Sequence, residues 1–476
     1  MDLMCFDTIM VRGPDLKANG RTVSTIIETK GPSGNSSFEL LTKYQDMIHD
    51  DHLPLLRLGS AMPLMNYTLF TKKLELDFQI SKADMVLLKD LSGIFARDIF
   101  VNKLLRRRAN YILSQYLPSP DQGWDSPVAK IVPKGIYPDT KLSKELDPMS
   151  CGILSSGGKE SLLTYGLLNE IGAKVHPFYI NESGGHWRTA LTGYRYHNRK
   201  DPNTARVWSN IDRFYVHMLD NLALIRNDHR RVRADTYPLR LCIFPVYLFH
   251  LLPLFAKRSI GNVLIGSEFD DPRTPSIHNG IPHYFGVYDQ TQDFDMMMES
   301  WYSKRMPGMR QWSAVRWIGG LVVQDILVQR YPELSILQRS CHSCNLEGED
   351  VYPCGKCTKC MGIQLFLAAG GHDPSRLGFS KEDSAFLVKR LTNSPLRLDK
   401  DELEHCRFLA SKQGHDLEGS ERPHVQSIHH HPYTANLDMI PEQFRTQLLN
   451  VLSQYTNSTT ELKDGKWMPI KLKEGA

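Results

Sequence analysis

Hydrophobic and polar positions follow different periods along the chain, and the pattern changes near residue 149. The segments Arg21 to Thr29 and Leu69 to Ile80 alternate between apolar and polar side chains, which is typical of half-buried strands. Residues 82–117 have helical spacing instead. Proline, aspartate, glycine and serine are frequent in residues 118–148, which we interpret as a linker or a long surface connection. We therefore expect an N-terminal accessory α+β domain over residues 1–148.

From residue 149 to 340, short apolar runs alternate with long helical patterns. This alternation is typical of strands joined by helices in a parallel α/β sheet. The expected buried strands are Gly152 to Leu154, Lys174 to Ile180 and Gly261 to Gly266. The expected helices are Ser161 to Ile171, Leu239 to Lys257 and Trp312 to Tyr331.

The polar composition and helical spacing of residues 376–476 predict a polar, helical C-terminal extension. Its candidate helices are residues 401–412 and 441–455. The run His429-His430-His431 invites a metal-binding interpretation, but three consecutive residues cannot share one helix face. We therefore expect these histidines in an exposed loop.

Composition limits the classes of function. The chain has 476 residues, more than one typical domain, with 41% apolar and 23% charged residues, as in ordinary globular proteins. The net charge is +4 and no long basic tract dominates, so we expect no nucleic-acid partner. No apolar run of about 18 residues and no signal peptide is visible, so we expect a cytoplasmic protein without a membrane partner. In that compartment, nine cysteines do not imply disulfides.

The run Ser155-Ser156-Gly157-Gly158-Lys159-Glu160-Ser161 lies between a predicted strand and a predicted helix. Adjacent glycines let a backbone approach phosphate closely, and the following helix N-terminus supplies unpaired N–H groups. The two neighbouring serines, Ser156 and Ser161, add hydroxyl donors, Lys159 adds charge, and Glu160 is a candidate ligand for Mg²⁺. The chain lacks the Gly-x-x-x-x-Gly-Lys-Ser/Thr loop of kinases and GTPases. The alternative is a simple glycine turn.

These residues resemble the SGGxDS motif of the N-type ATP pyrophosphatases. The resemblance implies that residues 155–161 bind the pyrophosphate part of ATP, with Lys159 and Ser161 as catalytic residues, and that the protein activates its substrate by adenylation. It also implies a doubly wound parallel sheet of the adenine nucleotide alpha hydrolase type over residues 149–340. Glu160 departs from the motif, which usually has aspartate there.

Five cysteines fall within twenty residues: Cys341, Cys344, Cys354, Cys357 and Cys360. Thiolates at such spacings can surround one tetrahedral Zn²⁺, and four sulfurs would close its coordination shell, which favours a structural zinc site over residues 341–375. The last three cysteines complete the set with either Cys341 or Cys344, while His342 is a weaker substitute. An iron–sulfur cluster and a redox pair remain as alternatives.

The order of the motifs resembles 7-cyano-7-deazaguanine synthases, over roughly residues 150–365. After the loop come Pro238-Leu239-Arg240, a strand ending at Asp271, Tyr288-Asp289 and the cysteine run. The resemblance implies Arg240 as a catalytic residue and Asp289 and Asp271 as substrate contacts. An aspartate at 289 could accept hydrogen bonds from a guanine-like N–H edge, or be a solvated loop acid. Leu241 replaces the family's asparagine, and the Tyr-Asp segment lacks its proline and cysteine.

The resemblance implies ATP-dependent adenylation of a 7-deazaguanine carboxylate, with Mg²⁺, and then amide formation with ammonia. The additional N- and C-terminal regions indicate a divergent relative. Synthase-like proteins of this kind occur in bacterial anti-phage defence operons, where the activated carboxylate is joined to an amine of a partner protein. The alternatives are a tRNA-modifying thiolase or amidating enzyme, the housekeeping synthase, and a nucleotide sensor without turnover. The family resemblance also suggests a homodimer.

Overall fold

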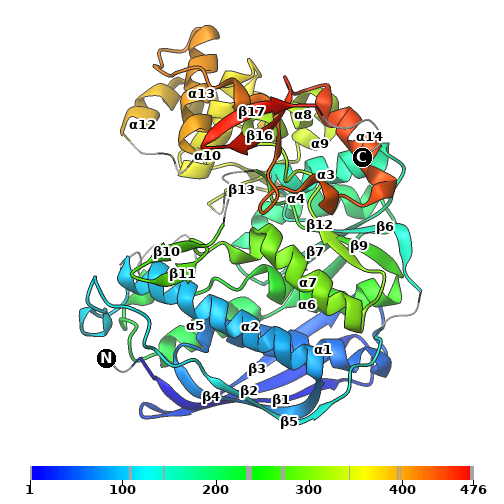
Figure 1. Ribbon diagram of the computed structural model, residues 1–476, viewed down its shortest axis with the longest axis vertical. Coiled ribbons are helices and arrows are strands. Elements are labelled where there is room, and N and C mark those ends of the chain that lie inside the picture. Colours follow the sequence, from blue (N-terminus) through cyan, green and yellow to red (C-terminus); the bar gives the residue numbers. More distant parts are fainter. Residues whose placement is uncertain are drawn as a thin grey trace.

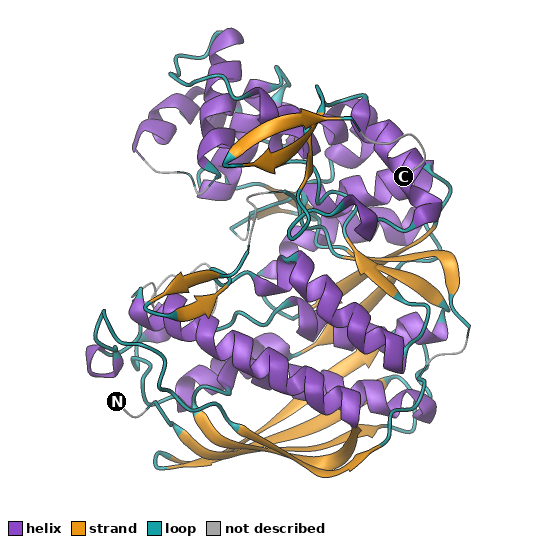
Figure 2. Cartoon of the chain, in the orientation of Figure 1, coloured by secondary structure: helices purple, strands orange, loops and turns teal. Residues whose placement is uncertain are grey.

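The computed structural model describes residues 3–106, 110–142, 145–231, 239–269, 274–341, 343–393, 396 and 398–471. Helices and strands combine into a mixed α/β structure around one large sheet (Figures 1 and 2). The sheet has ten strands in the order β12-β9-β6-β7-β8-β3-β2-β1-β4-β5. Most neighbouring strands in it are parallel.

The strands after residue 146 form the parallel part of this sheet. They are β6 (Asp147–Leu154), β7 (Lys174–Asn181), β8 (Ala205–Ser209), β9 (Ile260–Leu264) and β12 (Arg310–Trp312). The chain runs outward from β6 through β7 to β8, and then returns to β9 on the other side of β6. The direction of strand addition therefore reverses between β6 and β9, which leaves a crevice at the carboxyl ends of these strands.

The N-terminal strands continue the same sheet. They are β1 (Phe6–Leu16), β2 (Thr22–Gly31), β3 (Gly34–Tyr44), β4 (Thr71–Ser81) and β5 (Lys130–Tyr137). Strand β3 pairs antiparallel with β8, from Thr42 opposite Ser209 to Tyr44 opposite Val207. The domain boundary that we expect near residue 149 thus falls within one continuous sheet, which contains strands from both sides of the boundary. The linker interpretation is wrong for β5, which pairs in parallel with β4.

Helices cover both faces of the sheet, and each face has its own hydrophobic core. On β9, the neighbouring residues Val263 and Leu264 belong to different cores because successive side chains of a strand point to opposite faces. The core of Leu264 includes α3 (Lys159–Glu170), α8 (Gly320–Arg330) and α14 (Glu442–Ser453). The core of Val263 includes α1 (Leu53–Ala61), α2 (Lys82–Ile99) and α6 (Phe244–Lys257).

Three predicted helices have different bounds in the structure. Helix α2 ends at Ile99 and continues as a π-helix, Phe100–Leu105. Helix α6 begins at Phe244, five residues later than expected, and Pro245 in its first turn suits a helix start because that turn needs no N–H donor there. Helix α8 begins at Gly320. The residues Arg310–Trp312, which border the span expected for that helix, form strand β12 at the sheet edge.

The C-terminal extension contains strands as well as helices. Strands β15 (Ile428–His430), β16 (Thr459–Lys463) and β17 (Lys466–Ile470) make a separate sheet, so a purely helical extension is wrong. The predicted helices are present as α13 (Lys400–Lys412) and α14. His429 lies in β15 and is buried, contrary to the expected exposed loop, because it stacks on Phe269.

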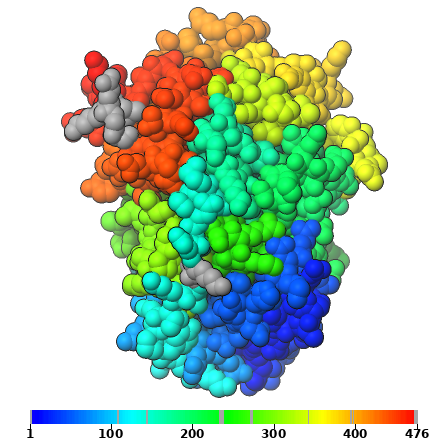
Figure 3. Space-filling model, turned by 90° about the vertical axis from the view of Figure 1, so that its right-hand side faces the viewer, coloured from blue at the N-terminus to red at the C-terminus, as the bar shows by residue number. Residues whose placement is uncertain are grey.

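The remaining elements complete the connections and the cysteine-rich region. They are α4 (His186–Lys200), α5 (Ile211–Asn221), β10 (Ser276–His278), β11 (Ile281–His283), α7 (Gln292–Arg305), α9 (Pro332–Ser335), β13 (Asn345–Glu347), β14 (Asp350–Tyr352), α10 (Thr358–Ala369), α11 (Lys381–Ala385) and α12 (Leu387–Asn393). In Figure 3 the N-terminal strands lie at one end of the molecule and the C-terminal extension at the other. Within the described ranges, no helix is both long enough and apolar enough to span a bilayer.

Candidate functional site

The predicted phosphate loop is a tight turn between β6 and α3. Gly157 has φ of +80°, in the left-handed region, and a Cβ atom there would lie 2.3 Å from the carbonyl oxygen of Thr189 in α4. Only glycine fits both the backbone angle and this close approach. Gly158 has an ordinary φ of −82° and is the N-cap of α3. The turn therefore directs the first N–H groups of α3 toward the space beyond the carboxyl end of β6. This is a favourable position for an anion.

Hydrogen bonds of two serine hydroxyl groups stabilise this turn. The Ser156 amide donates to Ser161 Oγ (3.4 Å), and Ser161 Oγ donates to the Gly158 carbonyl (3.2 Å). The Gly158 amide donates to Ser156 Oγ at 3.3 Å. Ser161 is buried, with 4% of its surface exposed. Its hydroxyl thus stabilises the loop from within rather than lining the cavity above it.

A cavity of about 490 Å³ lies directly above the turn. The loop contributes Ser155, Ser156 and Glu160, from the end of β6 and the start of α3. The other walls come from the ends of β7 and β9, from α4, α6 and α10, and from the C-terminal extension. They include Phe178, Ile180, Glu182, His186, Arg240, Tyr247, Glu268, Phe269, Gln292, Arg316, Lys359 and Thr434. The cavity therefore occupies the crevice where strand addition reverses, the usual ligand position in open α/β sheets.

Lys159 is buried between two carboxylates and is not among the residues that line the cavity. Its Nζ atom lies 2.6 Å from Glu160 Oε1 and 2.5 Å from Glu268 Oε2. Burial disfavours its charge, but the two carboxylates outweigh burial and raise the pKa of Lys159 above its usual value. Burial raises the pKa of Glu268, the ammonium group of Lys159 opposes this rise, and the nearby charge of Glu160 adds to it. Carboxylate oxygens beside a phosphate-type loop are ligands that Mg²⁺ accepts, and Glu160 lines the cavity.

Arg240 also lines the cavity, where it forms a buried ion pair. Its Nη2 atom donates to Glu182 Oε1 (3.0 Å) and to the Tyr247 hydroxyl (2.5 Å), and its guanidinium lies over the Tyr215 ring at 4.8 Å. Glu182 directly follows β7 and is only 2% exposed. Its second oxygen, Oε2, has no hydrogen-bond partner among the described residues. Such a buried acceptor on a cavity wall suits a ligand N–H donor. No sequence motif marks Glu182.

The structure does not place either of the two predicted substrate aspartates, Asp289 and Asp271, in the cavity. Asp289 is buried and is not among the residues lining the cavity. Its Oδ2 atom accepts hydrogen bonds from the Ile243 and Phe244 amides, both at 2.9 Å, and so caps the N-terminus of α6. Burial raises the pKa of Asp289 to about 6. Asp289 is therefore neither a solvated loop acid nor a group lining the cavity. Asp271 lies outside the described residues.

Two further cavity residues come from glycine-rich and cysteine-rich segments. His186, after the Ser183-Gly184-Gly185 run, lines the cavity at the start of α4. Burial and the positive charges of Arg240 and Lys359 lower the pKa of His186 to about 4, so it is neutral at pH 7. Lys359 reaches the same cavity from the first turn of α10.

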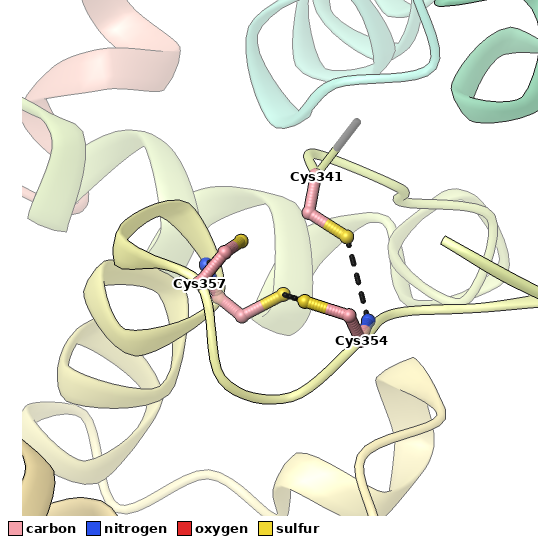
Figure 4. Close-up of side chains that lie close together, drawn as sticks. Cys341, Cys354 and Cys357 are labelled. Carbon is pink, nitrogen blue, oxygen red and sulfur yellow. Dashed lines mark hydrogen bonds between the residues drawn. The ribbon is translucent and has the colours of Figure 1, made fainter. Parts of the chain in front are cut away.

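Four of the clustered cysteines converge on one point. The sulfur atoms of Cys341, Cys354, Cys357 and Cys360 all lie within 4.8 Å of one another, a set that could hold a metal ion. Cys354 and Cys360 have sulfurs 3.8 Å apart. The Cys354 amide faces the Cys341 sulfur at 3.4 Å (Figure 4). Zinc–thiolate bonds of about 2.3 Å in a tetrahedron separate sulfurs by about 3.8 Å, so the donor set fits zinc.

In this geometry Cys341, and not Cys344, is the fourth cysteine of the candidate metal site. Cys344 is outside the converging set, and its thiol donates to the Cys341 carbonyl at 2.9 Å. His342 lies outside the described residues. Cys357 is the N-cap of α10 and accepts the Cys360 amide at 3.4 Å. The cysteine cluster therefore fixes the start of the helix that carries Lys359 into the cavity.

Comparisons with known proteins do not identify a family for this chain. None of the protein-family models, curated proteins or solved structures against which the chain was compared matches it.

Proposed function

We propose that this protein is an ATP-dependent ligase that adenylates a 7-deazaguanine carboxylate, releases pyrophosphate and then forms an amide with an amine. One observation carries the proposal. The Ser-Gly-Gly-Lys-Glu-Ser turn, which resembles the pyrophosphate-binding motif, lines a cavity large enough for a nucleotide at the carboxyl ends of parallel strands. Turns at this position bind phosphates through backbone N–H groups and the helix N-terminus.

The strand order supports the finer assignment of the fold. Outward addition from β6 to β8, followed by a return to β9 and β12, is the order of a doubly wound sheet. We propose that this part has the adenine nucleotide alpha hydrolase arrangement, with the N-terminal strands added to its β8 edge.

The chain's own residues have separate tasks in this proposal. The N–H groups at the start of α3 bind the β- and γ-phosphates. Lys159, which is buried behind Glu160 and is not among the residues lining the cavity, adds positive charge that stabilises the departing pyrophosphate. Glu160 would hold Mg²⁺, which neutralises phosphate charge when bound. Lys159 is already paired to Glu160 and Glu268, and the positive charge of Lys359 also acts on Glu160.

The reaction then proceeds in two displacements. A carboxylate oxygen of the deazaguanine attacks the α-phosphorus, and the bond to pyrophosphate breaks. A neutral amine then attacks the acyl carbon, the bond to AMP breaks, and the nitrogen loses a proton to solvent. The carboxylate must lie near the α-phosphate, and Arg240 lines the same cavity as a positively charged group for this orientation.

Glu182 is our candidate for recognition of the deazaguanine ring. A guanine-type edge presents neighbouring N–H donors, Glu182 lines the cavity, and its Oε2 atom is a buried acceptor without a hydrogen-bond partner among the described residues. Arg240 fixes the other oxygen of Glu182, so the carboxylate is oriented before a ligand arrives. This assignment replaces Asp289, whose carboxylate caps α6.

The cysteine cluster has a structural task in this proposal. Four thiolates complete the shell of Zn²⁺ and leave no position for water, which favours support of the fold over catalysis. The supported element is the start of α10, with Lys359. A positive charge at this wall would assist binding of an anionic substrate.

The test measures pyrophosphate release from ATP with 7-carboxy-7-deazaguanine, with and without ammonium, followed by mass spectrometry of the products. We expect release that depends on the carboxylate. Lys159→Ala should abolish release and leave the zinc content unchanged, whereas Lys174→Ala, which removes an exposed lysine at the start of β7, should alter neither. Absence of carboxylate-dependent release, or full activity of Lys159→Ala, would overturn the proposal.

A further inference from the structure

Three side chains beside the phosphate loop form a relay of hydrogen bonds that leads from the cavity into the protein interior. Ser155 directly follows β6 and lines the cavity of about 490 Å³. It has a hydrogen bond with Tyr179 of β7, and the Tyr179 hydroxyl lies 2.7 Å from His197 Nδ1 in α4. Tyr179 and His197 are buried and are not among the residues that line the cavity.

Close packing of two helices fixes the geometry of this relay. Gly193 lies one turn before His197 in α4, and a Cβ atom there would lie 3.0 Å from the Tyr179 hydroxyl oxygen. Because this is closer than an ordinary van der Waals contact, glycine leaves the room in which the hydroxyl meets His197. From α3, the Tyr165 ring packs on the imidazole with centroids 4.2 Å apart. Neither Tyr179 nor His197 therefore has space to turn away.

The imidazole of His197 determines the direction of the hydrogen bonds. Burial lowers the pKa of His197 to about 4, so the ring is neutral at pH 7 and has one N–H group. Its Nε2 atom is buried and has no hydrogen-bond partner among the described residues. Buried N–H groups without an acceptor are rarer in folded proteins than buried acceptors without a donor. The hydrogen therefore belongs on Nδ1, which donates it to the Tyr179 hydroxyl oxygen.

This direction makes Ser155 a donor. In the described part of the chain, Ser155 Oγ is the acceptor left for the hydrogen of Tyr179. The hydrogen of Ser155 then points elsewhere, and it is donated to the Ile153 carbonyl over a long distance of 3.4 Å. A charged phosphate oxygen is a stronger acceptor than a carbonyl at that distance. A phosphate in the cavity would therefore take over this hydrogen.

We propose that Tyr179 and His197 are positioning residues that hold the Ser155 hydroxyl as a hydrogen-bond donor to a phosphate oxygen in the cavity. The ligand class is pyrophosphate or a nucleoside triphosphate. That this phosphate belongs to ATP rests on the function proposed above, but the binding itself requires no turnover. Ser155 precedes the Ser-Gly-Gly-Lys-Glu-Ser motif, so the motif does not account for the relay.

The test measures binding to the full chain by titration calorimetry with Mg²⁺. The ligands are pyrophosphate and α,β-methylene-ATP, in which the bond between the α- and β-phosphates is not cleaved. We expect Ser155→Ala and Tyr179→Phe each to raise the Kd of the ATP analogue about tenfold. The double variant should bind no more weakly than Ser155→Ala alone, because both substitutions remove the same donor. An equal loss for pyrophosphate assigns the contact to the β- and γ-phosphates, and a loss for the analogue alone assigns it to the α-phosphate.

Tyr194→Phe is the matched control. Tyr194 belongs to the same aromatic cluster, with its ring 5.4 Å from that of Tyr179, but its hydroxyl accepts a hydrogen bond from Gln45 at 3.4 Å. Its loss should leave both Kd values unchanged. Circular dichroism and zinc content show whether each variant has folded.

Two measurements test the role of His197. His197→Asn keeps an N–H donor near the position of Nδ1 and should retain nearly the normal Kd, whereas His197→Leu removes the donor and should bind about as weakly as Tyr179→Phe. In the unmodified protein, ¹⁵N NMR of labelled histidine should show the hydrogen of His197 on Nδ1. The His197→Asn variant assigns that signal, and the measurement needs neither ligand nor turnover.

The outcomes separate the relay from the proposed function. A normal Kd for Tyr179→Phe, additive losses in the double variant, or a hydrogen on Nε2 of His197 would overturn the relay. Absence of binding of both ligands to the unmodified protein would overturn its phosphate role. The expected changes in Kd without carboxylate-dependent pyrophosphate release would refute the adenylation proposal alone. Normal release together with unchanged Kd values in the variants would refute the relay alone.

Discussion

Replacement of Gly157 by alanine tests the geometry of the turn between β6 and α3. The new Cβ would lie 2.3 Å from the Thr189 carbonyl oxygen, so the turn or the start of α4 must shift by about 1 Å to reach an ordinary contact. The positive φ costs about 1–2 kcal/mol for a residue with a Cβ, and an overpacked contact costs about 1–3 kcal/mol more. We therefore expect Gly157→Ala to lower the free energy of unfolding by about 2–5 kcal/mol.

Gly172 provides the matched control. It also has a left-handed φ, +81°, but a Cβ there would have no described neighbour within 4 Å. Gly172→Ala should therefore show only the backbone cost of about 1–2 kcal/mol. Urea denaturation measures both changes, and pyrophosphate release should fall steeply for Gly157→Ala alone because the loop N–H groups move. Equal losses of stability, or normal release by Gly157→Ala, would refute the reasoning.

The other predictions concern the cysteine cluster and the cavity walls. Cys341→Ser should reduce bound zinc to well below one equivalent by atomic absorption, whereas Cys344→Ser should retain it; the reverse result would exchange the two ligands. Glu182→Gln should raise the KM for the deazaguanine carboxylate at least tenfold with little change in the KM for ATP, whereas Asp289→Asn, which keeps a capping oxygen, should leave both constants near normal. Because Asp289 keeps its proton in the folded state up to about pH 6 but ionises near pH 3.8 when unfolded, the free energy of unfolding should fall as pH rises between these values. Denaturation of Asp289→Asn across this range should lack that contribution, and an identical pH profile would contradict it.

Local patterns predicted the elements whose signals are local. The alternation over residues 69–80 corresponds to β4, and the apolar spacing after the glycine pair corresponds to α3. Strands β5 and β12 were missed because their pairing comes from neighbours distant in sequence, while Pro133 within β5 weakens the strand signal. Local propensity contains no information on such partners.

The candidate site shows the same division between local and tertiary information. The spacing of the cysteines indicated a metal site, but only the folded chain separates Cys341 from Cys344, because both precede the same hairpin. Asp289 matched a short motif, yet its carboxylate is used by the amides at the start of α6. Glu182 carried no signal because its pairing with Arg240 joins residues 58 positions apart.

The antiparallel seam between β3 and β8 has a consequence for synthesis of the chain. When the ribosome has released the first three strands, the outer edge of β3 has no partner, and its partner β8 emerges more than 160 residues later. An open strand edge is a template for pairing with other chains. Until β8 arrives, this edge of the nascent protein is open to pairing with other chains. For the same reason, a chain cut between β5 and β6 would expose that edge permanently, and expression of either half alone would favour aggregation.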